Sequence, residues 1–558
     1  MKNNKAIVLK YSYLSTLLWL IMGISTLLNA QVKPNIELRF SDNPPLFKIK
    51  IPENPSVDTV QIDIKNQFLE KGYLGFSIDS VVESEGRCML FLRSGIPYKV
   101  SNIEVLPEEF SEFSKSFLAK RTLTQKFIGT HDSRILEAVQ NMGYPYAILE
   151  KDIGVKNSIA EIRYKVRSGN YVSFDSVRTS PSDLISYNYI SKKTGIEVGH
   201  PYSATAIKNL NRNINQSQLF VLDSAYFMLT EHKANVILKL KKGNQNNFNA
   251  LLGLQSNGNN KTELTGNASI TLNNAFKKGE KIELEWRNYG NESQQLETGF
   301  KLPYIFKLPI GVMFNGDFDK QDTSFSNTKL LLGILLPTLT YGDFSIQAKK
   351  QTSSVNKNYT EDLTSSYSTL YGMGYMYSLF DNALMPKNGF LFGSQLFTGK
   401  NNLIVNDQDD VATPMVEWVG NVQFAVPMPL GSLFFENEWG VLKNDSLKRN
   451  NFYRLGGVKS IRGFNEKSIY AKAYSYSNFE YRLFLSTESF AYLLYDVGYF
   501  NEPMNNGFDA VWRQAFGVGF NINTAAGQLS ISYAVGKYGT ESVSVNQGKI
   551  HMGYINRF

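Results

Sequence analysis

The sequence of 558 residues has one cysteine and four histidines. A chain with a single cysteine forms no internal disulfide, and Cys88 in "GRCMLFL" is typical of a small buried strand residue rather than a nucleophile. His131, His200, His232 and His551 are scattered without the spacing of metal ligands. The G-x-S-x-G motif of esterases is also missing. We therefore expect neither an enzyme nor a bound cofactor or metal.

Long apolar runs are confined to the N-terminus. Lys2 and Lys5 precede the apolar residues 14–28, and "LNA" ends at Ala30. This order predicts a secretory signal peptide over residues 1–30, because the apolar run is too short and wrongly flanked for a stable membrane anchor. No later run reaches the roughly 18 apolar residues of a helical membrane span.

Charge of one sign is not concentrated anywhere in the chain. The net charge of +8 is spread along the sequence, without a basic stripe interleaved with aromatics, so nucleic acid is not an expected partner. The 31 tyrosines, 37 phenylalanines and 42 glycines favour a β-rich structure. The length indicates more than one domain.

A repeat occupies residues from about 35 to 245. Residues 64–82, 135–153 and, more weakly, 207–227 each read as an amphipathic helix, a turn and an alternating strand, and a second strand follows each of them. This pattern predicts three α+β modules of order β-α-α-β-β, the first without a clear opening helix. The expected modules are 31–97, 98–168 and 169–245.

From residue 246 to 558, apolar and polar side chains alternate, as in "GQLSISYAVG". About sixteen such segments have the length of a tilted membrane-spanning strand. Short turns such as 427–431 and 524–527 alternate with long polar loops such as 353–366 and 400–414. The pattern predicts a 16-stranded antiparallel transmembrane β-barrel with both ends in the periplasm. A soluble sandwich, with the apolar face as its core, is the alternative.

One long loop of the expected barrel carries Ile461, Arg462, Gly463 and Phe464, "IRGF". The chain resembles the BamA/TamA superfamily of outer-membrane assembly and translocation barrels, the bacterial surface antigen family. The features that carry the resemblance are this tetrapeptide, the signal peptide, the modules, the barrel and the segments 385–392, 478–485, 494–500 and 527–534. The resemblance covers essentially the whole mature chain. The modules are then similar to POTRA (polypeptide-transport-associated) domains, and their number favours a TamA-like protein.

The resemblance implies that the loop, residues 444–473, folds back into the barrel and that its arginine pairs with acids on the wall. Alternation in the two following strands points Glu480 and Asp496 into the lumen. An arginine fork suits such a bidentate contact. The alternative is a solvated arginine on an external loop. Two positions depart from the family pattern: Leu494 replaces an aromatic residue, and Asn556 replaces an apolar one.

The function implied by the resemblance is assembly, insertion or translocation at the outer membrane of a Gram-negative cell, with the modules in the periplasm. The modules would capture unfolded outer-membrane or secreted client proteins by adding a client strand to a sheet edge. The barrel seam, between its first strand and the last strand ending at Phe558, would pass or template them. Outer-membrane lipid and a periplasm-spanning protein are the other expected partners. A two-partner-secretion transporter with one dedicated substrate, or a passive porin or receptor, are the alternatives.

Overall fold

A computed structural model places the chain in two compact units, Met1–Tyr171 and Val172–Phe558. The described residues run from 35 to 557, apart from 46, 52–55, 85–86, 115–120, 218, 244–245, 257–261, 291, 357–361, 383–384, 406–407, 410–411, 487, 505–506, 525–526 and 539–547. The expected signal peptide, residues 1–30, and the terminal Phe558 lie outside the described residues.

The first unit holds two small α/β modules, each with a helix packed on a three-stranded sheet. Module 1 consists of β1 (Asn35–Phe40), α2 (Val57–Glu70), β2 (Ser77–Ser84) and β3 (Arg87–Arg93), and module 2 of β4 (Lys99–Leu106), η1 (Glu108–Ser114), α3 (Gln125–Asn141), β5 (Ile148–Lys156) and β6 (Ile159–Arg167). The Thr124 side chain caps α3 by accepting from the Phe127 amide. One face of α3 then buries His131, Ile135 and Val139, which are four residues apart.

Module 3 opens the second unit and has two α-helices and a three-stranded sheet. It consists of β7 (Ser173–Ser180), α4 (Tyr187–Thr194), α5 (Ala204–Asn215), β8 (Phe220–Leu229) and β9 (Lys233–Lys242). The three sheets have the orders β1-β3-β2, β4-β6-β5 and β7-β9-β8, with the first strand parallel to the central one. Each sheet therefore has its second strand (β2, β5 or β8) at an edge.

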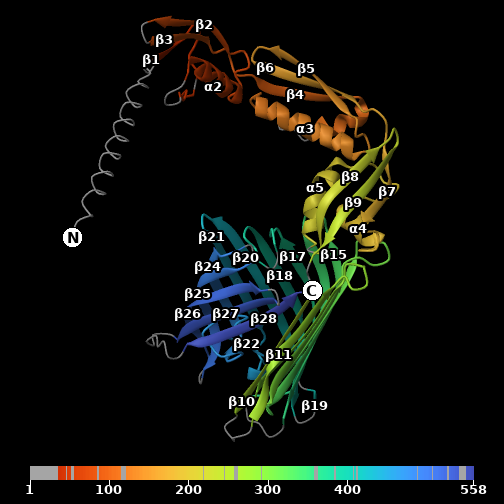
Figure 1. Cartoon of the computed structure of the whole chain (residues 1–558), viewed down its shortest axis with the longest axis vertical. Coiled ribbons are helices and arrows are strands. Elements are labelled where there is room, and N and C mark those ends of the chain that lie inside the picture. Colours follow the sequence, from red (N-terminus) through yellow and green to blue (C-terminus); the bar gives the residue numbers. More distant parts are fainter. Residues whose placement is uncertain are drawn as a thin grey trace, which may run out of the picture. The chain divides into compact units, whose positions relative to one another are not determined.

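The rest of the second unit is a closed barrel of 16 antiparallel strands (Figure 1). The first eight are β10 (Asn247–Ser256), β11 (Thr262–Asn273), β12 (Lys281–Gly290), β13 (Ser293–Leu302), β14 (Gly311–Gln321), β15 (Phe325–Pro337), β16 (Asp343–Val355) and β17 (Ser366–Ser378). The other eight are β18 (Gly389–Val405), β20 (Thr413–Met428), β21 (Gly431–Lys443), β24 (Ala473–Phe484), β25 (Phe490–Met504), β26 (Gly507–Thr524), β27 (Gly527–Tyr538) and β28 (Lys549–Arg557). The predicted fold class is confirmed.

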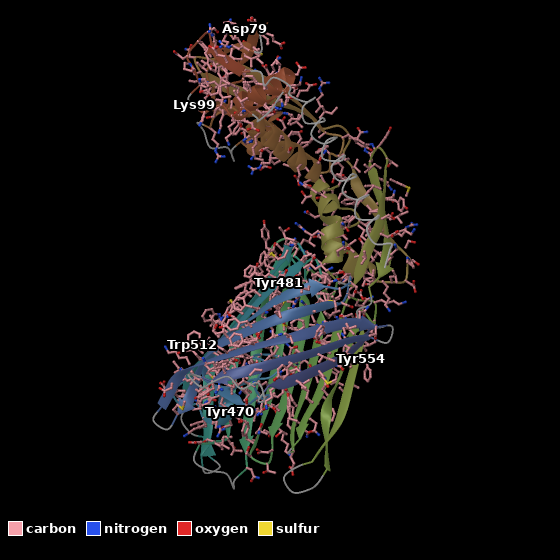
Figure 2. All side chains as sticks on the ribbon, turned by 60° about the vertical axis from the view of Figure 1, so that its left-hand side comes forward. Asp79, Lys99, Tyr470, Tyr481, Trp512 and Tyr554 are labelled. Carbon is pink, nitrogen blue, oxygen red and sulfur yellow. The ribbon has the colours of Figure 1, made fainter. Side chains whose placement is uncertain are left out.

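The barrel wall has an apolar outer face. On β15, Leu330, Leu332 and Ile334 are 44%, 61% and 50% exposed, and the residues between them are less exposed. Trp512 on β26 projects from the outer surface and is 57% exposed (Figure 2). An exposed apolar band of this kind is stable in lipid and costly in water. Among the described residues, no helix has the length and apolar composition that a membrane crossing requires.

One loop prediction needs correction. The loop expected at 400–414 is shorter, because β18 continues to Val405 and β20 begins at Thr413, and the short β19 (Gln408–Asp409) pairs with the end of β18. Main-chain pairing of Asn401 with Thr413 extends the hairpin there.

The loop after β21 has secondary structure of its own. It contains η2 (Arg449–Asn451), β22 (Tyr453–Leu455) and β23 (Ile469–Ala471), and the last two form a small hairpin.

Candidate functional site

The loop between β21 and β24, residues 444–472, fills part of the barrel lumen. Its apolar side chains pack on inward-facing residues of the wall: Ile461 is 0% exposed, and it shares a cluster with Tyr476 of β24 and Phe500 of β25. The loop therefore folds inward, in the place that the resemblance implies.

The structure brings Arg462 together with Glu480 on β24 and Asp496 on β25. The guanidinium donates from Nε and Nη2 to the two Asp496 oxygens, at 2.9 and 2.7 Å, and from Nη1 to Glu480 Oε1 at 2.5 Å. The Arg462 amide also donates to Asp496 Oδ2 at 2.9 Å. Asp496 is 0% exposed and Arg462 is 6% exposed. A buried carboxylate that receives three donors from one residue holds that residue in a single position.

Glu480 binds a second cation. Arg482, two residues further along β24, donates from Nε to Glu480 Oε2 at 2.8 Å, and its guanidinium lies 3.9 Å from the ring centre of Phe434. The period of two along a strand places Arg482 on the same inner face as Glu480. Glu480 therefore keeps a cation when Arg462 is removed, whereas Arg462 is the only ion-pair partner of Asp496 among the described residues.

Gly463 and Phe464 bring the tip of the loop against the last strands of the barrel. Gly463 has a φ of +82°, and a Cβ there would lie 2.6 Å from the Gly536 nitrogen on β27. The Phe464 ring in turn lies against Gly536. The Gly463 amide donates to His551 Nε2 on β28 at 3.4 Å. Glycine is needed here for both the backbone conformation and the close approach.

The first part of the loop is anchored by asparagines. Asn450, which is 0% exposed, donates from Nδ2 to Ser353 Oγ at 2.6 Å and to the Thr364 carbonyl at 2.9 Å, and its own carbonyl accepts from Asn327. Asn451 donates to Ser366 Oγ at 2.9 Å. These contacts fix the loop to strands β15 to β17 before it enters the lumen.

The seam between β10 and β28 is the weakest pairing of the barrel. Within the described residues, it consists of two residue pairs, Asn247–Arg557 and Phe248–Asn556. By contrast, β15 and β16 pair over 13 residues, from Phe325–Val355 to Pro337–Asp343. Within the part of the chain that the structure describes, the β10 backbone from 249 to 256 pairs with β11 only. No described strand covers its other edge, which is therefore available to a further strand.

Comparison with solved structures identifies this architecture. CdiB from Acinetobacter baumannii matches with a TM-score of 0.55 at 12% identity, over 100% of both chains. CdiB from Escherichia coli matches with a TM-score of 0.52 at 12% identity, over 88% of this chain and 95% of that one. The chain therefore shares its fold with the two CdiB structures. BamA from Haemophilus ducreyi, lacking POTRA domains 1–3, gives a TM-score of 0.45 at 14% identity, over 83% of this chain and 100% of that one. No family profile and no curated protein matches the sequence.

Module 3 packs against two barrel turns, the one between β11 and β12 and the one between β13 and β14. The Ser186 amide donates to the Lys277 carbonyl at 2.7 Å, and Asn274 Nδ2 donates to the Leu184 carbonyl at 2.8 Å. Tyr189 packs edge-on against Tyr304, with ring centres 5.7 Å apart, and its burial raises the pKa of its hydroxyl. Module 3 and the barrel are thus joined by main-chain as well as side-chain contacts.

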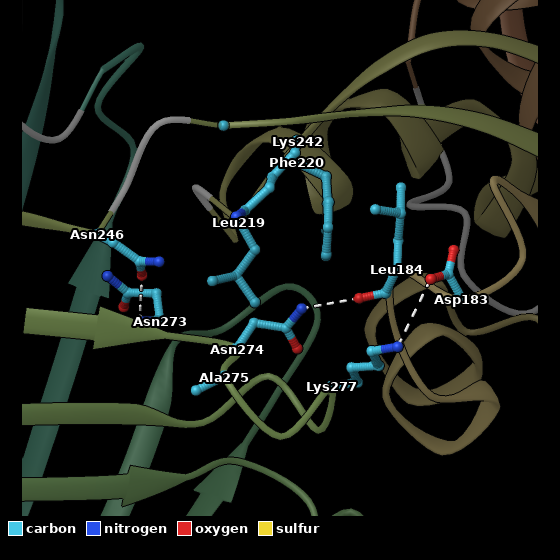
Figure 3. A pocket seen from close by; sticks show the side chains of 11 residues that line it. Asp183, Leu184, Leu219, Phe220, Lys242, Asn246, Asn273, Asn274, Ala275 and Lys277 are labelled. Carbon is cyan, nitrogen blue, oxygen red and sulfur yellow. Dashed lines mark hydrogen bonds and ion pairs between the residues drawn. The ribbon is translucent and has the colours of Figure 1, made fainter. Parts of the chain in front are cut away.

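A cavity of about 270 Å³ lies beside this docking contact, where the chain passes from β9 into β10 (Figure 3). Asp183, Leu219, Asn246 and Asn274 are among its lining residues. Asn246 Oδ1 accepts from the Asn273 amide at 2.8 Å, and Lys277 lies 3.6 Å from Asp183. The polar groups at this wall are therefore engaged with one another rather than directed at a ligand.

Several residues that hold the loop are not evident from the sequence. Arg454 and Lys467 both contact Asp319 on β14, and Lys459 contacts Glu285 on β12. The alternation of β12 and β14 could have placed the two acids inward. It could not indicate which cation of a distant loop would reach them. Among the described residues, no cluster of histidine, cysteine and acidic side chains could hold a metal ion.

Proposed function

We propose that this protein assembles or translocates client proteins at the outer membrane, and that client strands are templated at the barrel seam. The observation that carries the proposal is the seam, where among the described residues β10 from 249 to 256 and β28 from 549 to 555 each pair with a barrel strand on one side only. Main-chain groups without partners are costly in lipid. A client strand can supply those partners by β-augmentation, with little demand on its side-chain sequence.

The module sheets support the first step, client capture. Edge strands of soluble proteins usually carry charged residues that discourage strand addition. The second half of β8 instead presents Tyr226, Phe227, Met228 and Leu229, which are 56%, 40%, 53% and 39% exposed. Its charged residue, Asp223, lies in the first half, beside an irregularity in the pairing with β9. The β8 edge of module 3 is therefore the best-suited docking strand for a client.

Three modules favour a TamA-like factor that serves several outer-membrane proteins, with a periplasm-spanning protein as its partner and the modules in the periplasm. A two-partner-secretion transporter would serve one exported substrate. The inward loop supports both over a passive porin, because its buried hairpin occupies the lumen.

The test is a substitution on the proposed docking edge. Phe227→Lys places a charge on β8 and should lower the amount of client protein in the outer membrane or the medium, as measured by quantitative mass spectrometry. Val155→Lys on the β5 edge of module 2, where Val155 is 53% exposed, is the matched control. Loss of many barrels would indicate assembly, and loss of one secreted protein would indicate dedicated export. An unchanged proteome in Phe227→Lys cells would refute capture at β8.

A further inference from the structure

The inward loop contacts the barrel wall on both sides of the seam. On the first-strand side, Lys459 Nζ lies 2.9 Å from Glu285 Oε2 on β12 and 3.7 Å from Glu297 Oε2 on β13. These strands are the third and fourth of the barrel, counted from the seam. The loop is therefore tied close to the open strand β10.

A second contact on this side is more deeply buried. Asp319 on β14 accepts from Arg454 Nη1 at 2.9 Å and lies 3.1 Å from Lys467 Nζ, and the three side chains are 11%, 8% and 14% exposed. Arg454 belongs to β22, and Lys467 lies just before β23. One carboxylate thus holds both arms of the loop hairpin.

On the last-strand side, the tip of the same loop holds the other edge of the seam. Arg462 binds β24 and β25 through Glu480 and Asp496, while Gly463 and its neighbour contact β27 and β28. The contact with His551 is made on the closing strand itself. Side-chain contacts therefore join strands that lie on opposite sides of the two-pair seam.

We propose that the loop is a brace that holds the seam closed, with Asp319 as the positioning residue of its first-strand end. We call the contacts of Arg454, Lys459 and Lys467 with β12 to β14 the first-strand end, and those of the Arg462 segment the last-strand end. The two ends act in series, so release of either one frees the seam. The brace supplements a seam that has two residue pairs, where the β15–β16 ladder has 13. Because these ion pairs are partly buried, salt screens them less than surface pairs.

The test is hydrogen–deuterium exchange on the full-length protein in lipid nanodiscs. Asp319→Asn keeps the shape of the side chain and removes the charge that holds Arg454 and Lys467. We expect amide exchange in 549–557 and 247–256 to rise roughly tenfold, which corresponds to about 1.4 kcal/mol. Exchange in β15 and β16 should not change. Asp317→Asn is the matched control, because Asp317 lies on the same strand and accepts from Gln295 of the wall at 2.8 Å.

A second variant keeps the test decisive if Asp319→Asn disturbs folding. Lys459→Met changes a half-exposed side chain at the same end of the brace, and it should raise seam exchange in the same direction. Seam exchange equal to that of the wild type in the folded variants would overturn the brace. The brace rests on the proposed function only in that the seam is taken to be the place where client strands are templated. Faster seam exchange with normal client handling would therefore support the brace and contradict the proposed function of the seam.

Discussion

Removal of the Arg462 side chain should release the inward loop while the barrel stays folded. In Arg462→Ala, Glu480 keeps Arg482 at 2.7 Å, so the cost falls mainly on Asp496, which is 0% exposed and loses two side-chain donors. Breaking a buried ion pair costs roughly 3–5 kcal/mol, which would speed local opening of the loop by about a hundredfold to a few thousandfold.

The assay for this prediction is hydrogen–deuterium exchange of residues 453–471 in the intact protein. The Arg462 amide itself donates to Asp496, so its exchange reports the contact directly. Lys320→Ala is the control, because it removes an exposed ion pair with Glu292 at the rim, worth no more than about 1 kcal/mol. Heat-modifiable gel migration would verify that the barrel remains folded. Exchange of the loop at the wild-type rate in Arg462→Ala would refute the reasoning.

A double substitution separates the pair from its surroundings. Asp496→Asn alone removes the buried charge, and Arg462→Ala alone leaves that charge without its partner. If the two residues act on each other, the double variant should open the loop by less than the sum of the single effects. Additive effects would show that each residue stabilises the loop independently.

Three further predictions concern the rest of the chain. Burial, aided by Arg134, lowers the pKa of His131 in module 2, so on acidification the unfolded state binds a proton at this residue before the folded state does. The stability of the first unit, measured by urea unfolding, should therefore fall as the pH drops below about 6.5. His131→Phe should reduce this pH dependence, and an equal pH dependence in the variant and the wild type would contradict the prediction. In Gly279→Ala the new Cβ would lie 2.1 Å from the Tyr189 ring, so the variant should weaken the contact between module 3 and the barrel. The measurement is limited proteolysis, which should be faster near residue 244. Gly199→Ala, which has a similar φ but no atom within 4 Å of the new Cβ, should have no such effect. In planar bilayers the intact protein should show no large stable conductance steps, since such steps would indicate the porin alternative.

The inward positions of Glu480 and Asp496 were accessible from the sequence, because alternation along β24 and β25 assigns both residues to the inner face. The choice of Arg462 as their partner came from the resemblance of the "IRGF" tetrapeptide, since the same loop also carries Arg449 and Arg454. The module plan and the strand count followed from periodicity and turn lengths in the same way.

The first-strand end of the brace was not accessible by those rules. Arg454 and Asp319 are 135 residues apart, and their contact depends on the path of the loop across the lumen and on the stagger of the strands around the barrel. The Asn450 anchor has the same origin, since its partners on β16 and in the following loop are 97 and 86 residues away, respectively. Such contacts follow from the closed geometry rather than from any local pattern.

Whether this barrel handles client proteins is tested most directly by the proteome of the outer membrane and the medium after the protein is depleted. We expect one or more outer-membrane or secreted proteins to be lost, and wild-type protein to restore them while the Phe227→Lys variant does not. An unchanged proteome after full depletion would contradict a role in client handling.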